Sequence, residues 1–413
     1  MIKKKKYNKY DICIFILISS LAAGNLFGAL QLPRIFTLML FLPGVTALST
    51  AVKKNKGLCI YALLFIVFGF VSCLWTPAGF SEGFIAAIYN SVHLMLFLEI
   101  IAFSRKACNP INAIAYGFLI AFAITAFIAF GELITDSHLN TSKQDEASMG
   151  NTGEEVYVRY FAAATFYNMN TYVTVICLFL PFIFYGFSNS QFGLISRILF
   201  ALSTVGAIVI VLFNGSRGGF LAVGIMAMVY MYYSFFKMKQ SIIWGALLIA
   251  VVVVVLIYFG PVILNTLIMR SAVQGSLQEE SRFVIWNNVM KVVNEYFWLG
   301  CGAGGLQYAM IKYANGGITV AHNVFLEILS EYGFVFFVAF VLFVIKIYSR
   351  AKQVTEINRR LLLFQAIVSF PVIGIINSGY LESPVFWSYF SAIYIIANYE
   401  HIKPVSQVIF KTA

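Results

Sequence analysis

Apolar residues fill most of the chain in runs of roughly 20 positions, and short polar segments separate the runs. A helix needs about 20 apolar residues to cross roughly 30 Å of hydrocarbon, so each run is long enough to span a membrane. This pattern predicts twelve membrane-spanning helices. Their approximate limits are 12–31, 35–52, 58–75, 80–103, 110–132, 160–187, 197–213, 219–236, 241–266, 323–348, 361–378 and 383–399.

The composition agrees with this pattern. Of the 413 residues, 61% are hydrophobic and 11% are charged, whereas a soluble domain is about 25% charged. We therefore expect an all-α integral membrane protein with one polytopic domain over residues 1–413. The first run, 12–31, ends without a small-residue cleavage site, so we interpret it as a retained anchor and not as a signal peptide.

The positions of the cations predict the topology, because Lys and Arg stay on the cytoplasmic side of short loops. With both termini cytoplasmic, 20 of the 28 lysines and arginines fall inside. The net charge of +11 then lies where it suits an anionic leaflet. We therefore exclude nucleic acid as a partner.

Two predicted outer loops are long, at about 133–159 and 267–322, and we expect the second, which precedes the tenth span, to be partly helical. Five of the eight predicted outer cations are arginines: Arg34, Arg159, Arg217, Arg270 and Arg282. A planar guanidinium binds phosphate through two parallel hydrogen bonds, whereas lysine acts as a point charge. This bias indicates an anionic ligand at the outer face.

Arg217 stands in "FNGSRGGFLAVG", at the predicted start of the eighth span. Ser216 can cap that helix, and Gly218 and Gly219 leave its first turn uncovered. Backbone N–H groups and a guanidinium at a helix N-terminus favour phosphate binding. The alternative is an arginine that reaches out of a helix end toward water.

Arg282 belongs to "ESRFVIWNNVMKVVNEYFW" and shares an apolar helical face with Trp286. A charge on that face is costly unless it meets an anion or a carboxylate. The alternative is a structural salt bridge to Glu279, Glu280 or Glu331.

His322 opens "HNVFLEILSEYG" at the outer mouth of the tenth span. Along that helix Asn323, Glu327 and Glu331 form a polar stripe, which should face a cavity and not lipid. The helix N-terminus disfavours imidazolium, so His322 would be neutral and able to accept a proton. The alternative is a structural histidine. The topology places Arg217, Arg282 and His322 on one face of the membrane, as transfer from a diphosphate requires.

The run "GCGAGG", Gly300 to Gly305, fits the dinucleotide pattern G-x-G-x-x-G. That interpretation needs a preceding β-strand and a βαβ unit, which the sequence does not predict. We expect turn glycines instead. The six cysteines have no metal-ligand spacing, so no metal site is predicted.

Together these residues resemble the O-antigen ligase and polymerase superfamily. "SRGGFL" is similar to the first arginine motif, with Arg217 and Leu221; "SRFVIWNNVMKVV" and "WLGCGAGG" resemble the loop arginine with its glycine-rich run; "HNVFLEILSEYG" resembles the histidine motif. "YNMNTY" is similar to an N-P-N element, with Met169 in the proline position. The motif-bearing catalytic region would cover 160–380 and include the outer loop 267–322.

The resemblance implies a GT-C-type fold in the bacterial cytoplasmic membrane and a metal-independent, cofactor-free, inverting glycosyltransferase with its active site on the outer face. The donor would be an oligosaccharide on undecaprenyl diphosphate. Arg217 and Arg282 would hold the diphosphate, and His322 would orient or deprotonate the acceptor hydroxyl. The supporting substrate-binding candidates are Arg159, Asn168, Asn170, Asn323 and Glu331.

Within the superfamily we favour a polymerase of O-antigen, capsule or exopolysaccharide, with a flippase and a chain-length regulator as further partners. The alternatives are a ligase that uses lipid A core as acceptor and a type that transfers glycans to protein, which usually carries an extra segment. A twelve-helix transporter is the distant alternative. It predicts an internal two-fold repeat, and residues 1–200 and 201–413 show no convincing one.

Overall fold

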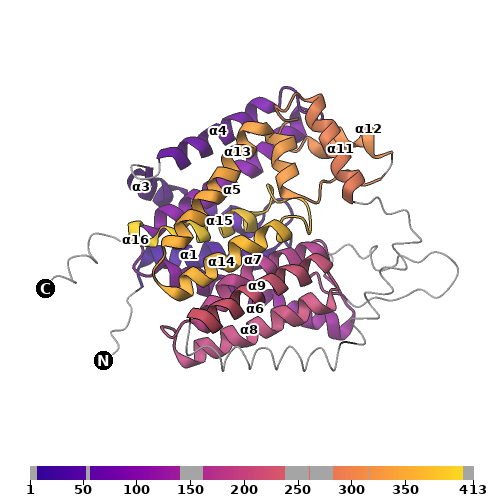
Figure 1. The fold of residues 1–413 in the computed structure, drawn as a ribbon. Coiled ribbons are helices and arrows are strands. Elements are labelled where there is room, and N and C mark those ends of the chain that lie inside the picture. The colour runs from indigo at the N-terminus through magenta and orange to yellow at the C-terminus, as the bar shows by residue number, and fades with distance from the viewer. Residues whose placement is uncertain are drawn as a thin grey trace.

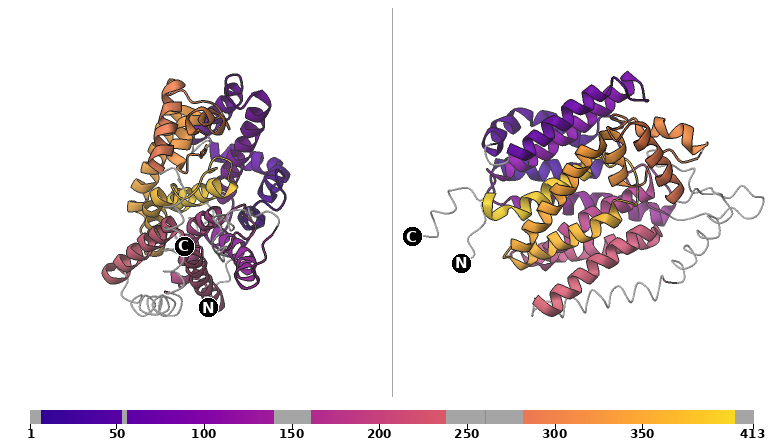
Figure 2. Two further views of the ribbon diagram at one scale, coloured as in Figure 1. Left: turned by 90° about the vertical axis from the view of Figure 1, so that its right-hand side faces the viewer. Right: turned by 45° about the horizontal axis from the view of Figure 1, so that its top comes forward.

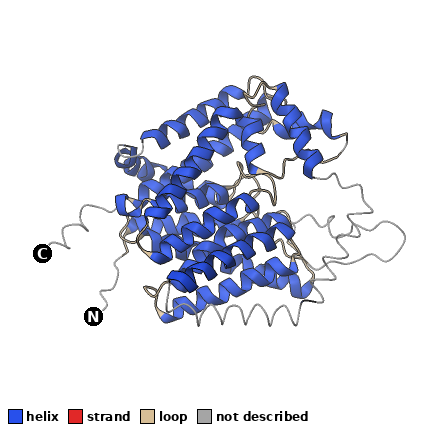
Figure 3. Cartoon of the chain, in the orientation of Figure 1, coloured by secondary structure: helices blue, strands red, loops and turns tan. Residues whose placement is uncertain are grey.

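The structure is a computed structural model that describes residues 7–52, 56–139, 161–237, 260, 282–315 and 317–402. Over these ranges the chain forms helices joined by loops, and no strand occurs among them (Figure 3). The all-helical class is therefore confirmed for the described residues. The expected ninth span, 241–266, and the first part of the outer loop, with Arg270, lie outside them.

Most helices follow the predicted spans in position, whereas the helix of the sixth expected span, 160–187, begins only at Met169. Their bounds are α1 Lys9–Ser19, the 3-10 helix η1 Ser20–Ala23, α2 Leu32–Met39, α3 Phe41–Val52, α4 Lys56–Ser72, α5 Phe80–Ser104, α6 Pro110–Thr135, α7 Met169–Ser188, α8 Leu194–Phe213, α9 Arg217–Lys237, α11 Arg282–Glu295, α12 Leu306–Ala314, α13 Val324–Gln353, α14 Ile357–Ile373, α15 Pro384–Ala397 and α16 Tyr399–Ile402.

Six of the described helices are long and apolar enough to cross a membrane, namely α5, α6, α7, α8, α9 and α13. The apolar helices α4 and α15 are shorter, with 17 and 14 residues. A multi-pass membrane protein accounts for these helices. The total of twelve spans stays a prediction.

The helices form an upper and a lower group around a central layer (Figure 1). In the centre, α14 and α15 pack on α7, which is almost wholly buried. The upper group contains α4, α5 and α13, and the lower group contains α6, α8 and α9. The short helices α11 and α12 pack on each other and on α13 at one end of the bundle (Figure 2).

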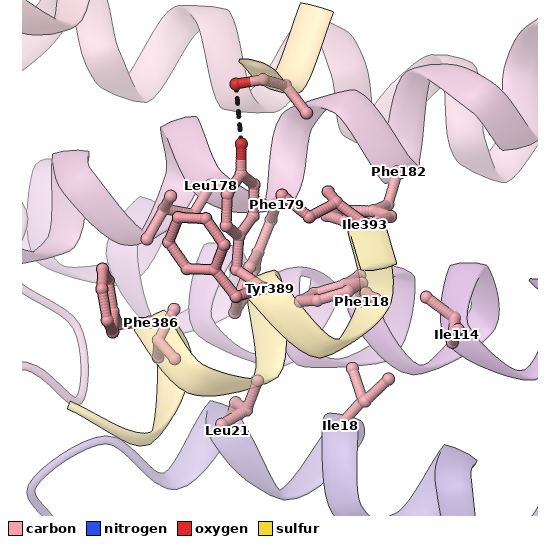
Figure 4. Packing of buried hydrophobic residues seen from close by; sticks show 14 of the residues in the cluster. Ile18, Leu21, Ile114, Phe118, Leu178, Phe179, Phe182, Phe386, Tyr389 and Ile393 are labelled. Carbon is pink, nitrogen blue, oxygen red and sulfur yellow. Dashed lines mark hydrogen bonds between the residues drawn. The ribbon is translucent and has the colours of Figure 1, made fainter. Parts of the chain in front are cut away.

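The central layer is held by interlocked aromatic and aliphatic side chains. Around Tyr389 of α15, side chains of α6, α7 and α1 close in from three sides (Figure 4). Phe118 of α6 stacks on Phe182 of α7 with ring centroids 4.2 Å apart. The Tyr389 hydroxyl donates to the carbonyl of Ala366 at 2.7 Å. Because every polar group in this layer needs a partner inside the protein, this bond lets a tyrosine be fully buried.

Two early spans differ from the expected single helices. The helical part of the first expected span ends with η1 at Ala23, because Gly24 has a φ of 48°, which only glycine adopts without cost. The second expected span is divided into α2 and α3 at Leu40. Pro43 lacks the N–H that would bond to the carbonyl of Met39, which explains the break.

The tenth span is interrupted at Gly333, whose φ of 81° and ψ of 178° are not helical. The eleventh span ends at Ile373 and not near 378. Residues 374–383 instead form the α14–α15 loop. Both departures shape the candidate site.

Candidate functional site

The α14–α15 loop, residues 374–383, is the element to which the predicted site residues attach. Its backbone carbonyls accept hydrogen bonds from α11 and α13, and its backbone N–H groups donate to a side chain of α13. The first bond is from Val324 N–H at the start of α13 to the carbonyl of Gly374, at 2.8 Å. This bond places the start of α13 directly against the end of α14.

His322 is fixed to this loop through its backbone. Its N–H donates to Oγ of Ser378 at 2.8 Å, and its φ of 45° lies in the left-handed region, a cost that the surrounding contacts must offset. Nδ1 of the imidazole is buried and has no hydrogen-bond partner among the described residues. Burial, and then the nearby charge of Arg282, lowers the pKa of His322 from 6.5 to about 4. The imidazole is therefore neutral at physiological pH.

Arg282 is the first residue of α11, and its guanidinium reaches the same loop. Nη2 donates to the carbonyl of Ile376 at 3.2 Å, and Nη1 donates to the carbonyl of Ile375. Both carbonyls lie just past the C-terminus of α14, where the helix dipole favours a cation. One turn further along α11, Trp286 Nε1 donates to the carbonyl of Ala321 at 3.1 Å. These contacts bring Arg282 and His322 together.

Arg217 begins α9, and its side chain is exposed. Ser216 Oγ accepts from Gly219 N–H at 3.4 Å, which is the expected serine cap. A Cβ on Gly218 would lie 2.8 Å from Cγ1 of Ile376. The start of α9 therefore packs on the residue whose carbonyl binds Arg282, so both arginine motifs meet the α14–α15 loop at Ile376.

Asn168 and Asn170 lie at the start of α7. Asn168 Oδ1 caps the helix by accepting from the N–H groups of Asn170 and Thr171 at 2.8 and 3.0 Å. The next contact leads to the loop, because Asn377 Nδ2 donates to Thr171 Oγ1 at 2.6 Å. The "YNMNTY" element thus lies beside the same loop as the other motifs.

The polar stripe on α13 binds the protein's own backbone. Asn323 caps the helix, with Oδ1 accepting from Phe325 N–H at 3.0 Å. Glu327 accepts from the N–H groups of Tyr380 and Leu381 at 3.3 and 3.5 Å. Asn323 and Glu327 therefore hold the start of α13 and the second half of the α14–α15 loop in place.

Glu331 and the glycine run secure the break in α13. The interruption at Gly333 leaves the carbonyls of Ser330 and Glu331 without helical hydrogen bonds. Cys301 N–H donates to the carbonyl of Ser330 at 2.7 Å, and Gly302 N–H donates to that of Glu331 at 3.0 Å. The carboxylate of Glu331 accepts from Gly304 N–H at 3.2 Å. The run "GCGAGG" is therefore a set of turn glycines, as expected, and the described residues directly before it, 282–299, contain no strand.

The α14–α15 loop is also held from the N-terminal half, by Arg34 of α2. Its Nε donates to Nε2 of His93 at 2.9 Å, which leaves the other ring nitrogen, Nδ1, to face the carbonyl of Leu381 at 3.4 Å. A second guanidinium nitrogen, Nη1, donates to the carbonyl of Ala29 at 2.7 Å. The Arg34 guanidinium also lies 3.7 Å from the ring centroid of Tyr89. This buried cation binds the protein itself.

Several sequence candidates fall elsewhere. Arg159, Glu279 and Glu280 lie outside the described residues. Glu331 was the third carboxylate considered as a salt-bridge partner of Arg282, and it accepts from Gly304 N–H instead. Within the described ranges no group of three or more His, Cys, Asp and Glu side chains could hold a metal ion.

The motifs of Arg217, Arg282 and His322 lie in one stretch of the sequence, and that stretch matches a known protein family. Residues 201–341 match the O-antigen ligase family. The resemblance to the O-antigen ligase and polymerase superfamily is confirmed. The matched segment contains Arg217, Arg282 and His322, whereas Arg34, Asn168 and the α14–α15 loop lie outside it.

Two curated proteins extend the similarity over most of the chain. The teichuronic acid biosynthesis protein TuaE of Bacillus subtilis (strain 168) is 22% identical over 423 aligned positions, covering 93% of this chain and 83% of that protein. A ComP-specific O-oligosaccharyltransferase of Acinetobacter baylyi (strain ATCC 33305 / BD413 / ADP1) is 23% identical over 358 positions, covering 80% of this chain and 59% of that protein. The chain is a multi-pass membrane protein that is similar to proteins of surface-glycan ligation and biosynthesis.

Sequence reasoning did not identify the α14–α15 loop as the element that joins the motifs. Most of its bonds use backbone carbonyl and N–H groups, which every residue type carries, so no residue pattern marks them. One signal was present. The stretch "NSGYLESP" is polar and falls, in the predicted topology, on the same face as Arg217, Arg282 and His322, where a loop between two spans commonly carries function.

Proposed function

We propose that the protein is a surface-polysaccharide polymerase of the bacterial cytoplasmic membrane. It transfers a glycan from undecaprenyl diphosphate to a sugar hydroxyl of an acceptor chain at the outer face. The observation that carries the proposal is the meeting of Arg282, His322 and the start of α9 at residues 375–378. TuaE, which takes part in teichuronic acid biosynthesis, aligns over 93% of the chain.

The diphosphate would lie between Arg217 and Arg282. Arg217 begins a helix whose first turn carries two glycines, and such a helix start would offer backbone N–H groups and a guanidinium to a phosphate. Arg282 is held by two carbonyls, which fix the guanidinium plane next to His322. As the sugar–oxygen bond breaks, negative charge grows on the leaving diphosphate, and these cations stabilise it.

His322 would act on the acceptor. The acceptor oxygen attacks the anomeric carbon, a new glycosidic bond forms, and the bond to the diphosphate oxygen breaks. The hydroxyl proton passes to the neutral imidazole, at the buried nitrogen Nδ1 that has no partner among the described residues. Undecaprenyl diphosphate leaves as the second product. Attack from the opposite side inverts the anomeric configuration, and no metal ion enters the reaction.

Ligation is the second candidate function, and a specific observation favours it. The matching family is described as O-antigen ligase, and one relative is named an O-oligosaccharyltransferase. A ligase would use the same donor and the same residues but would transfer a finished chain to a different acceptor, lipid A core. The distinction therefore depends on the acceptor.

Incubation of the purified full-length protein with its undecaprenyl-diphosphate repeat unit tests both candidates. A polymerase produces a ladder of lengthening chains from the donor alone, in the presence of EDTA. A ligase produces a product only after lipid A core is added. The proposal is contradicted by the absence of product in both reactions, or by wild-type activity of the His322→Ala variant.

A further inference from the structure

A groove of about 580 Å³ runs between α9 and α14 and reaches the C-terminal turn of α13. The volume is in the range of sites that bind small molecules, roughly 300–1,000 Å³. The groove lies toward the opposite end of α9 from Arg217 and of α14 from Ile373. It is therefore separate from the candidate site for glycan transfer.

The walls of the groove are apolar along most of its length. Five aliphatic and aromatic side chains form them: Ile225, Met228, Val229, Phe364 and Val368. Tyr232 and Tyr233 follow along α9, toward the end of that helix. Met228 is 56% and Val368 is 43% exposed, so the helices that line the groove leave part of this surface uncovered.

One end of the groove is cationic. Lys237 lies in the last turn of α9 and Lys352 in the last turn of α13, and Arg360 follows in the first turn of α14. All three line the groove, and no carboxylate of a described residue does. No ion pair among the described residues involves them. Three cations near one another repel, so this arrangement favours an anion at that end.

The groove also has a suitable length. From Ile225 to Lys237, α9 rises about 18 Å at 1.5 Å per residue. One leaflet contributes about 15 Å, half of the roughly 30 Å hydrocarbon core. An apolar channel of one leaflet's depth that ends at a cluster of cations matches the shape of a phospholipid. A free phosphate would use the cations but would leave the apolar walls unfilled.

We propose that this groove binds one anionic phospholipid of the inner leaflet, with an acyl chain between α9 and α14 and the phosphate at Lys237, Lys352 and Arg360. The predicted topology puts these cations on the cytoplasmic side, where basic pockets between spans bind anionic headgroups. Arg360 is already oriented, because its Nε donates to the carbonyl of Val354 at 2.6 Å. The inference does not rest on the proposed glycan transfer.

Native mass spectrometry of the delipidated full-length protein tests the proposal, with phosphatidylglycerol and phosphatidylcholine as probes at equal concentration. Phosphatidylglycerol should bind at least about tenfold more tightly. The triple variant Lys237→Gln, Lys352→Gln and Arg360→Gln should lose this preference. The matched control replaces Lys9, Lys56 and Lys346 with Gln. These three exposed lysines lie on the same predicted face, and the control should stay within about twofold of the wild type.

A second variant separates binding in the groove from general folding defects. Val368→Trp keeps all three cations and fills the partly exposed channel, so it should weaken phosphatidylglycerol binding while the melting temperature without lipid stays near the wild-type value. Equal losses in the groove triple variant and the control triple variant would show a diffuse surface charge effect and overturn the proposal. Equal affinity of the wild type for both lipids, or full binding by Val368→Trp, would also overturn it.

Discussion

The backbone N–H of His322 donates to Oγ of Ser378 across 2.8 Å, although 56 positions separate the two residues in sequence. The bond ties a residue with a φ of 45° to the loop whose carbonyls bind Arg282. The position of the imidazole next to the guanidinium thus depends on a loop that lies outside the family match.

Ser378→Ala removes this bond. A single hydrogen bond contributes about 1 kcal/mol, so kcat should fall roughly fivefold as the imidazole loses its position. The KM for the donor should change little, because Ser378 bonds only to the backbone of His322 among the described contacts. Ser378→Thr keeps the hydroxyl and should restore kcat in steady-state assays. If Ser378→Ala raises KM and leaves kcat unchanged, the result would argue against a positioning role.

The pH profile should report the lowered pKa of His322. In the free enzyme the imidazole is neutral above about pH 4, so kcat/KM should persist at pH 5 and fall only near pH 4. The same lowering makes stability independent of this group above pH 6.5 and reduces stability as the pH falls from 6.5 toward 4. An acidic limb of kcat/KM near 6.5 would contradict a buried base.

The profile of kcat should differ from that of kcat/KM. Bound diphosphate offsets the charge of Arg282, one of the two causes that lower the pKa of His322. The base should then be stronger in the complex than in the free enzyme. The acidic limb of kcat is therefore expected at higher pH than that of kcat/KM. If the two limbs coincide, the result contradicts the binding of diphosphate near His322.

Lysine should replace neither Arg217 nor Arg282 well. An ammonium group keeps the charge but cannot form two parallel bonds to phosphate, so each variant should lose roughly tenfold or more in kcat/KM. Arg197→Lys is the control, because Arg197 donates to the carbonyl of Phe187 away from the site. Wild-type rates in both site variants would contradict binding of the diphosphate by these arginines.

Gly333→Ala should destabilise the protein. The position has a φ of 81°, and a Cβ there would lie 2.2 Å from the carbonyl oxygen of Leu299. We expect a loss of at least about 3 kcal/mol, seen as a lower melting temperature in detergent. Gly224→Ala is the matched control in α9, where a Cβ meets nothing within 4 Å. Equal melting temperatures for the two variants would contradict the strain.

Arg34→Gln should act on the site from a distance. The variant removes a buried cation that binds His93 and two backbone carbonyls, each a bond worth about 1.5–3 kcal/mol for a charged donor. Both the melting temperature and kcat should fall, because the residues near Leu381 lose support. Lys346→Gln, an exposed cation on α13, should change neither.

The sequence predicted where most helices lie because long apolar runs leave no other stable structure in a membrane. It also indicated Arg217, Arg282 and His322, because charged and titratable residues within a motif can be recognised from the amino-acid sequence. The breaks near Gly24 and Leu40 were missed because hydropathy does not record backbone geometry. Arg34 was interpreted as one of several outer arginines, and only the fold shows that His93 holds it.

The interruption of α13 has a practical consequence for exchanging parts between relatives. Trp298 and Phe334 are joined by a backbone bond of 2.8 Å, and Cys301 and Ser330 by one of 2.7 Å. A chimera with a junction between these partners would take the two sides of each bond from different parents. The backbone packing there leaves no space for a side chain at Gly333. The two sides of the interruption, Trp298 to Cys301 and Ser330 to Phe334, should therefore be taken from the same parent.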